Sequence, residues 1–343
     1  MKRKGFCLFS LIIVIILSGC SSNKMRLFKK SEILMDTMVS ITVVSESREK
    51  AEAAIDRAFK EIKRLEGLLN FYSEQSEISE INRNSGIRPV KVSPETYDLV
   101  RISRIISEKT GGAFDITIGP ISGLYDFVRK KRPSPQEIQR LLPLVGYKKI
   151  LLNPEERTVF LMKKGMEIDP GGITKGYAAD RAVEVLKGEG IKAALVAIAG
   201  DIRCYGTKPD GGDWVVGIQN PRTGKGGEVF ATIRLRDMAI STSGDYQRYF
   251  MEHGKRYHHI LDPATGLPAH GLISVTVVGP LATYTDSLAT AVFVKGLPGG
   301  QRLAEEMGYY VVAVDRAGNI HISDGIKKRV SMILDRIDVG SEQ

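Results

Sequence analysis

The stretch EIDPGGITKGYAAD, residues 167–180, decides the fold of this chain. Its proline and two glycines at 170–172 turn the backbone sharply after Asp169. A glycine turn that opens a helix leaves backbone N–H groups unpaired, and the helix dipole makes that end attract anions. With Lys175 one turn in, the stretch predicts a pyrophosphate site, and an ordinary turn with a surface lysine is the alternative. The helix itself is predicted by apolar residues at helical spacing: Tyr177, Ala178, Ala182, Val183 and Leu186.

Outward from this stretch the pattern alternates between helices and strands. Helices are predicted at 47–70, 93–110, from 134 onward, 285–295 and 298–307, where Ser-Pro pairs at 93–94 and 134–135 mark two of the starts. Strands are predicted at 33–44, 149–152, 158–161, 193–199, 214–219, 228–235, 238–242, 273–279, 309–314 and 329–334. No repeat or low-complexity linker divides the chain. We therefore expect one α+β (mixed α/β) unit of two intimately joined subdomains.

Composition narrows the function classes. The 343 residues are 43% hydrophobic and 26% charged, which is typical of a globular protein, and the net charge is +9. No basic run is interleaved with aromatic residues, so nucleic acid is not an expected partner.

The first twenty residues have the pattern of a bacterial export signal. Basic residues at 2–4 precede an apolar segment at 6–17, and the run LSGC ends at Cys20. A small residue directly before a cysteine resembles the lipobox. We expect residues 1–19 to be a lipoprotein signal peptide, Cys20 to carry the lipid and 20–32 to form a tether.

This pattern predicts an extracytoplasmic protein that is lipid-anchored to a membrane. The inner membrane is favoured and the outer membrane stays open. A plain signal peptide or a short membrane anchor is the alternative, although the apolar segment is short for a spanning helix. Of the three cysteines, Cys7 lies in the signal and Cys20 would carry the lipid, so only Cys204 would remain as a thiol. No intrachain disulfide is therefore expected, and Cys204 is predicted to be a structural thiol.

A second glycine-rich segment follows the helix predicted at 93–110. Gly111 and Gly112 would let the backbone approach a flat ligand closely, and Phe114 and Asp115 could pack against it and accept a hydrogen bond from it. A helix C-cap followed by a core phenylalanine is the alternative.

Two further segments carry residue types suited to catalysis. His259 ends a predicted strand and is a candidate general base or ligand contact; because His258 and His259 point to opposite faces, at most one should face a site. Asp286 and Thr290 lie four apart near the start of a predicted helix. A carboxylate, a hydroxyl and a backbone carbonyl form a partial oxygen site of the kind Mg²⁺ completes with substrate phosphates. Helix capping by Asp286 is the alternative.

In order along the chain these segments resemble the FAD:protein FMN transferase family of the ApbE type. The motifs that carry the resemblance are Met35-Asp36-Thr37, Ala113-Phe114-Asp115, Asp169-x-Gly-Gly-x-x-Lys175-Gly, Gly200-Asp201-Ile202, His259-Ile-Leu-Asp-Pro-x-Thr-Gly266 and Asp286-x-x-x-Thr290. Two departures are visible: the family often has Met-Gly-Thr at 35–37 and Asn-x-Gly-Gly-Asp at 197–201.

The resemblance implies a T-fold-like architecture over 33–343 and a reaction that transfers the FMN moiety of FAD to a threonine hydroxyl of a partner protein, with release of AMP. It implies that Mg²⁺ is held by Asp286, Thr290 and the carbonyl near Gly172. The implied partners are exported or membrane redox subunits with a threonine motif. The residues implied to contact FAD are Met35, Tyr72, Ala113, Phe114, Asp115, Asp169 and Lys175, with His259 close by.

For the reaction we expect Mg²⁺, the N–H groups of Gly171 and Gly172, and Lys175 to balance the diphosphate charge. His259 or Asp286 would take the threonine proton, and the sequence does not choose between them. Two other functions remain open at this stage: an Mg²⁺-dependent FAD pyrophosphatase, in which water is the acceptor, and a non-catalytic flavin-binding lipoprotein.

Overall fold

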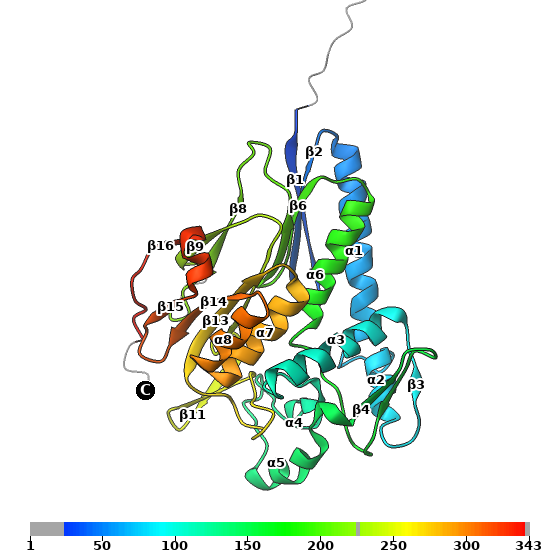
Figure 1. Cartoon of the computed structure of the whole chain (residues 1–343). Helices are drawn as coiled ribbons and strands as arrows, with labels where there is room; N and C mark the ends of the chain where they lie inside the picture. The colour runs from blue at the N-terminus through cyan, green and yellow to red at the C-terminus, as the bar shows by residue number, and fades with distance from the viewer. Residues whose placement is uncertain (1–23, 224–226, 340–343) are drawn as a thin grey trace, which may run out of the picture.

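In the computed structural model, which describes residues 24–223 and 227–339, an eight-stranded antiparallel sheet forms the centre of the molecule (Figure 1). Every neighbouring pair in this sheet is antiparallel. The sheet order is β1 (Arg26–Leu34), β2 (Thr37–Ser45), β6 (Ala193–Ile198), β7 (Asp201–Tyr205), β10 (Ala239–Gly244), β13 (Leu272–Gly279), β14 (Tyr310–Asp315) and β15 (Ile320–Ile322).

Helices cover one face of this sheet, with α1 (Arg48–Leu69) and α6 (Thr174–Gly188) over its first strands and α7 (Ala282–Lys295) and α8 (Gly299–Glu306) over its last (Figure 1). Helix α1 begins at the N-cap Ser47, whose side chain accepts the N–H of Lys50, and buries one apolar stripe. Helix α6 packs against both α1 and α7. This contact brings the EIDPGGITKGYAAD stretch against the helix that carries Asp286.

Between α1 and α6 the chain forms a subdomain of short elements. The Ser-Pro starts predicted at 93 and 134 are confirmed, since Ser93 and Ser134 cap two of these helices. The elements are α2 (Glu77–Arg83), β3 (Val90–Lys91), α3 (Pro94–Thr110), η1 (Ile116–Ile118), α4 (Gly119–Ser122), α5 (Pro135–Leu141), η2 (Leu142–Leu144), η3 (Tyr147–Lys149), β4 (Ile150–Asn153) and β5 (Thr158–Leu161).

A second sheet of three strands, in the order β16 (Val330–Met332), β9 (Val229–Leu235), β8 (Trp214–Gln219), packs on the face of the main sheet opposite the helices. Trp214, Ile218 and Phe230 share a core with Ile240 and Val278 of β10 and β13. The 3₁₀ helix η4 (Asp324–Arg329) precedes β16.

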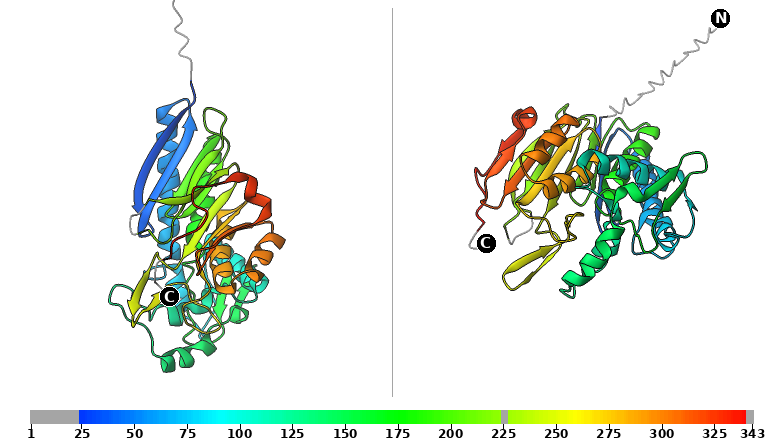
Figure 2. Two further views of the ribbon diagram at one scale, coloured as in Figure 1. Left: turned by 90° about the vertical axis from the view of Figure 1, so that its left-hand side faces the viewer. Right: turned by 60° about the horizontal axis from the view of Figure 1, so that its bottom comes forward.

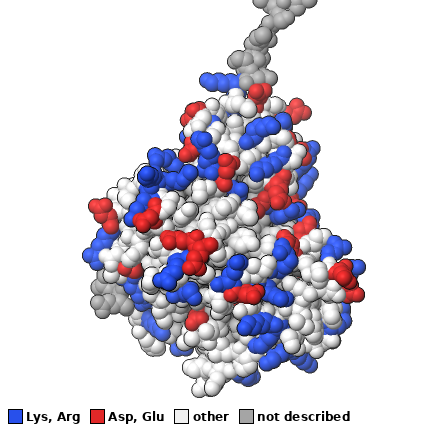
Figure 3. Space-filling model, viewed as in Figure 1, with Lys and Arg blue, Asp and Glu red and all other residues white. Residues whose placement is uncertain are grey.

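A small hairpin, β11 (Tyr249–Glu252) and β12 (Lys255–His258), extends beside α5 (Figure 2). Phe127 and Phe250 lie with ring centroids 6.1 Å apart, and Arg132 donates to Glu252 at 2.6 Å, so the subdomain and the hairpin are joined. On the face of the molecule shown in Figure 3, Lys and Arg are interspersed with Asp and Glu. None of the described helices combines the length and apolarity needed to span a membrane.

The N-terminal prediction is wrong in two respects. The single strand predicted at 33–44 is a hairpin of β1 and β2, which reverse at Met35 and Asp36 with φ values of 53° and 55°. Because β1 begins at Arg26, the tether predicted to reach residue 32 is cut short by strand pairing. Sequence periodicity did not detect the turn because Asp36, although a common turn residue, stands in an otherwise strand-like run without an accompanying glycine or proline.

Both family departures fall on left-handed backbone. Asp36 has φ 55° and Ala199, in the turn between β6 and β7, has φ 51°. Glycine adopts this conformation without strain, so the glycine that the family pattern led us to expect at each of these positions would suit the backbone. The turn geometry is therefore retained in this chain with aspartate and alanine.

Two other features differ from the sequence predictions. The strand predicted at 329–334 pairs with β9 in the small sheet and does not close the main sheet. Strands β7, β11 and β15 were not predicted, because each is only three to five residues long and gives too short a pattern. Cys204 is buried and free, as predicted. The lipidation predicted for Cys20 lies outside the described residues.

Candidate functional site

All twelve predicted site residues line one pocket of about 930 Å³. It lies where the β1–β2 turn, the β6–β7 turn, the start of α6 and the side of α7 meet the 70–170 subdomain. The residues brought together are Met35, Tyr72, Ala113, Phe114, Asp115, Asp169, Gly171, Gly172, Lys175, His259, Asp286 and Thr290. This volume lies near the upper end of the range of small-molecule and cofactor pockets, about 300–1,000 Å³.

The glycine turn is fixed from both sides. The Asp169 N–H donates to the carbonyl of Ile116 at 2.7 Å, and Asp169 Oδ1 accepts the N–H of Gly171 at 3.0 Å. The Thr174 N–H and hydroxyl both bond the carbonyl of Pro170, at 3.1 and 2.8 Å. The helix therefore opens into the pocket, and its N-cap, Ile173, has no side-chain cap.

Asp286 diverts one hydrogen bond of this helix. Its Oδ2 accepts the N–H of Gly176 at 3.0 Å, the group that would otherwise bond the carbonyl of Gly172. Among the described residues no hydrogen bond uses that carbonyl. A Cβ on Gly172 would lie 3.4 Å from Thr290 Oγ1, so the carbonyl-bearing residue and the threonine are close neighbours.

The three groups form an oxygen-rich donor set. It contains one buried carboxylate, one hydroxyl and one carbonyl, and Thr290 Oγ1 also lies 3.3 Å from Ser243 Oγ. Hard oxygen donors with few protein ligands are what Mg²⁺ uses when substrate phosphates and water complete its shell. The residues present therefore fit a magnesium ion, and Asp286 is not an N-cap, because α7 begins at Ala282.

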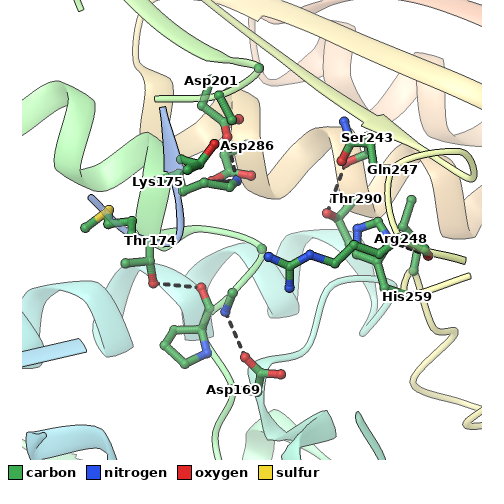
Figure 4. Close-up of a pocket in the computed structure, with 18 of the residues that line it drawn as sticks. Asp169, Thr174, Lys175, Asp201, Ser243, Gln247, Arg248, His259, Asp286 and Thr290 are labelled. Atoms are coloured by element: carbon green, nitrogen blue, oxygen red, sulfur yellow. Dashed lines mark hydrogen bonds and ion pairs between the residues drawn. The ribbon is translucent and has the colours of Figure 1, made fainter. Parts of the chain in front are cut away.

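Lys175 is held between two buried carboxylates. Its Nζ lies 2.5 Å from Asp201 Oδ2 and 3.7 Å from Asp286 Oδ2 (Figure 4). Burial alone would lower the pKa of Lys175, but Asp201 and Asp286 outweigh it and raise that pKa. Burial, and next the neighbouring Asp201 charge, raises the pKa of Asp286 to about 7. A cation at Asp286 would relieve this unfavourable charge.

Asp180 sets the register between the two helices. One turn beyond Gly176 on α6, its carboxylate accepts the N–H groups of Ala282 and Thr283 at 3.0 and 2.8 Å, and it also pairs with Arg203. It thus caps the start of α7 from the side. Asp286 sits one turn further along α7, opposite Gly176.

The segment 113–115 lines the pocket, but its aspartate is turned inward. Asp115 Oδ1 accepts from the N–H and hydroxyl of Thr117 at 2.9 and 2.7 Å, and Oδ2 accepts the N–H of Tyr147 at 2.7 Å. Gly111 is a left-handed C-cap and Phe114 is buried. The capping alternative is therefore correct for the backbone, and Asp115 orders the loop that carries Ala113 and Phe114 to the pocket.

The two histidines separate as predicted. His258 is buried, and its ring contacts the carbonyl of Ala269 at 3.0 Å, whereas His259 lines the pocket just beyond the end of β12. His259 Nδ1 lies 3.3 Å from the carbonyl of Arg248, which assigns the proton to Nδ1 and leaves Nε2 as an acceptor. Burial lowers the pKa of His259 to about 3, so the ring is neutral.

Sequence reasoning missed three pocket residues as site residues. Asp201 pairs with Lys175, Ser243 contacts Thr290, and the side chain of Arg248 reaches into the pocket (Figure 4). Asp201 and Ser243 lie at or just beyond the ends of strands that run to the pocket. A polar residue at such a strand end was the sequence signal that could have identified them. Arg248 gave none, because β11, the strand that follows it directly, was not predicted.

Comparison with known proteins identifies the family. The sequence model of the ApbE family matches residues 35–313, which is most of the chain. The chain belongs to the ApbE family. Family members that it resembles include the FAD:protein FMN transferase of Treponema pallidum, at 32% identity over 94% of this chain and 95% of that protein. The Haemophilus influenzae FAD:protein FMN transferase is also 32% identical, covering 82% of each chain.

Solved structures of ApbE proteins share the fold. The ApbE protein of Thermotoga maritima superposes with a TM-score of 0.81 and 35% identity over 89% of this chain and 99% of that chain. The flavinyl transferase ApbE of Pseudomonas stutzeri, in its apo form, gives a TM-score of 0.78 and 27% identity over 89% and 97%. The predicted α+β architecture of the ApbE type is therefore confirmed.

Proposed function

We propose that this chain is a FAD:protein FMN transferase, which moves the FMN moiety of FAD to a threonine hydroxyl of a partner protein and releases AMP. The observation that carries the proposal is the diverted hydrogen bond at Asp286. It leaves the carbonyl of Gly172, a residue that adjoins Thr290, without a hydrogen bond in the described part of the chain, at the open N-terminus of α6. This is an arrangement for holding a charged diphosphate together with its metal.

Asp286, Thr290 and the Gly172 carbonyl would hold Mg²⁺, which supplies charge neutralisation at the diphosphate when bound. The chain's own cations and N–H groups do the rest. Lys175 carries a fixed positive charge next to the helix N-terminus, and the turn at 170–172 points its backbone toward the same space. These groups stabilise negative charge that builds up on the phosphoryl oxygens.

The bond changes are those of one phosphoryl transfer. The threonine oxygen attacks the phosphorus on the flavin side, the P–O bond to AMP breaks, and AMP leaves with the bridging oxygen. The threonine proton needs an acceptor, and the neutral His259 offers Nε2 inside the pocket. Asp286 is less suited to this role because its Oδ2 is already bonded to Gly176.

Mass spectrometry tests the proposal. The enzyme is incubated with FAD, Mg²⁺ and an acceptor domain that carries a threonine flavinylation motif. We expect the acceptor to gain the mass of one FMN less water, and the gain to disappear with EDTA. An unmodified acceptor with FAD converted to FMN and AMP would make the protein a pyrophosphatase. Intact FAD bound without turnover, in a trial where a known transferase modifies the same acceptor, would make it a flavin binder.

We also propose that the protein acts outside the cytoplasm, anchored through a lipid on Cys20, and that its acceptors are exported or membrane redox subunits. The sequence 17–20 supports this, because it places a small residue before the cysteine at the end of an apolar segment. The test is membrane fractionation of cells that express the full chain or its Cys20→Ala variant. Release of the variant into the soluble exported fraction is expected, and equal membrane retention of both would contradict the anchor.

A further inference from the structure

Strand β8 has a free edge that borders the pocket. It is the terminal strand in the order β16-β9-β8, and Gly217 and Gln219 line the same pocket as Lys175 and Asp286. Edge strands present unpaired N–H and C=O groups in a row, and extended peptides add to such edges.

The direction of the β8 backbone groups follows from one hydrogen bond. The N–H of Asn220 donates to the Glu228 carbonyl at 2.9 Å, so residue 220 faces β9. Because backbone groups alternate along an antiparallel strand, Val216 and Ile218 also face β9, and Val215 and Gly217 face outward. Within residues 24–223 and 227–339 no hydrogen bond uses the outward groups of those two residues.

An open sheet face lies next to this edge. The helices α1 and α6 cover one side of β1, β2 and β6, and β8 stands on the other (Figure 1). On β2, Val39, Ile41 and Val43 are buried under the helices, so Met38, Ser40 and Thr42 face the side of β8.

This face is built for close approach. Ser40 lies opposite Ala197 of β6 and hydrogen-bonds Ser31 of β1 at 2.7 Å, so its centre is made of small side chains. Met38 and its cross-strand neighbour Ile33 are 56% and 77% exposed. Ile202, opposite Ala197 on β7, lines the pocket together with Gly217, so the open face, the β8 edge and the pocket are continuous.

We propose that the β8 edge and the adjoining open face of β1, β2 and β6 are the docking surface for the acceptor protein. An extended segment of the acceptor would pair with Val215 and Gly217 as an added strand and carry its threonine into the pocket. This inference rests on the proposed function, because it takes the acceptor to be a protein. Backbone pairing suits an enzyme whose acceptor must bring its main chain close to the reacting groups. The hydrogen bonds of an added strand fix an extended segment of the acceptor whatever side chains that segment carries.

Val215→Pro tests the edge without touching the pocket lining. Val215 is 57% exposed, and proline is tolerated on an edge strand where its missing N–H would face outward. The matched control is Met332→Pro on β16, the opposite edge of the same sheet. We expect Val215→Pro to raise the KM for a purified acceptor domain about fivefold to tenfold, the effect of one lost hydrogen bond, with the KM for FAD unchanged. Met332→Pro should leave both constants at the parent values.

Hydrogen exchange gives a second readout that does not depend on the variant. The acceptor domain with its threonine replaced by valine is added to the parent enzyme, and exchange of the Val215 and Gly217 amides is followed. Protection that appears only with the acceptor supports the docking surface. An unchanged acceptor KM in Val215→Pro together with unprotected amides would overturn it, as would protection that follows the enzyme's own concentration, which would make the edge a contact between two copies.

The outcome is separable from that of the proposed function. If the parent enzyme does not modify the acceptor at all, the transferase proposal fails. If the parent enzyme modifies the acceptor but Val215→Pro leaves the acceptor KM unchanged and the β8 amides stay unprotected, only the docking-surface proposal fails.

Discussion

Asp286 Oδ2 accepts the backbone N–H of Gly176 at 3.0 Å, so one carboxylate joins two helices and frees the Gly172 carbonyl. The same side chain is thus structural and, in our proposal, a metal ligand. The two roles can be separated, because an amide oxygen can still accept the Gly176 N–H but lacks the negative charge that binds a cation.

We predict that Asp286→Asn keeps the fold and loses FMN transfer. Its thermal midpoint should stay close to that of the parent, while transfer falls at least about a hundredfold at millimolar Mg²⁺. The measurement pairs a melting curve with the mass-spectrometric transfer assay. Full activity of the variant after removal of Mg²⁺ would refute the metal assignment.

Gly176 permits the close contact between α6 and α7. A Cβ at this position would lie 2.1 Å from the Ala282 carbonyl oxygen and 2.8 Å from Asp286 Cβ. Gly176→Ala should therefore force the helices apart and cost about 3 kcal/mol of unfolding free energy. The matched control is Gly188→Ala at the other end of α6, where nothing lies within 4 Å.

For Gly188→Ala we expect an unchanged or slightly higher stability, because alanine is the better helix former. Chemical denaturation of both variants measures the contrast. Equal stabilities for the two would contradict a close α6–α7 contact at Gly176.

The sequence predicted the elements of this site better than their connections. The glycine turn, the helix behind it and the pair Asp286 and Thr290 are local patterns, and each is readable from residue spacing. The Asp286–Gly176 bond joins residues 110 positions apart and depends on how two helices pack. Such contacts come from tertiary packing, and no local pattern reports them.

The inward turn of Asp115 is a second case of this kind. The sequence around Asp115 looks the same whether the aspartate binds a ligand or, as in the structure, bonds Thr117 and Tyr147. Arg248 was missed for a related reason, since its hairpin has weak alternation. The β1–β2 turn was missed because its two left-handed residues, Met35 and Asp36, interrupt a run that otherwise has the pattern of one strand.

Asp201 is predicted to keep Lys175 away from the metal ligand. Lys175 Nζ is 2.5 Å from Asp201 and 3.7 Å from Asp286. In Asp201→Asn the lysine would keep one anionic partner, Asp286, and compete with Mg²⁺ for it. We expect the Mg²⁺ concentration for half-maximal transfer to rise about tenfold. Titration of transfer rate against Mg²⁺ measures it, and an unchanged midpoint would argue that Asp201 acts only in folding.

His258 predicts a pH dependence of stability. Burial lowers its pKa to about 4, from an ordinary value near 6.5 in the unfolded chain. As the pH falls, the unfolded state therefore binds a proton at His258 before the folded state does. The contribution of His258 to stability is complete above about pH 6.5 and is lost as the pH falls toward 4. Between pH 7 and pH 5 the loss from this residue is about 2 kcal/mol.

The test compares unfolding free energies of the parent and His258→Gln at pH 7 and pH 5. Glutamine keeps a donor and an acceptor near the Ala269 carbonyl and the Ile260 N–H but does not titrate. The variant should be less stable at pH 7 because the fit is poorer, yet it should lose about 2 kcal/mol less than the parent on acidification. Parallel losses in both proteins would mean that His258 is not the group whose protonation destabilises the fold, and the neighbouring His259, whose pKa is also lowered, would be the next to replace.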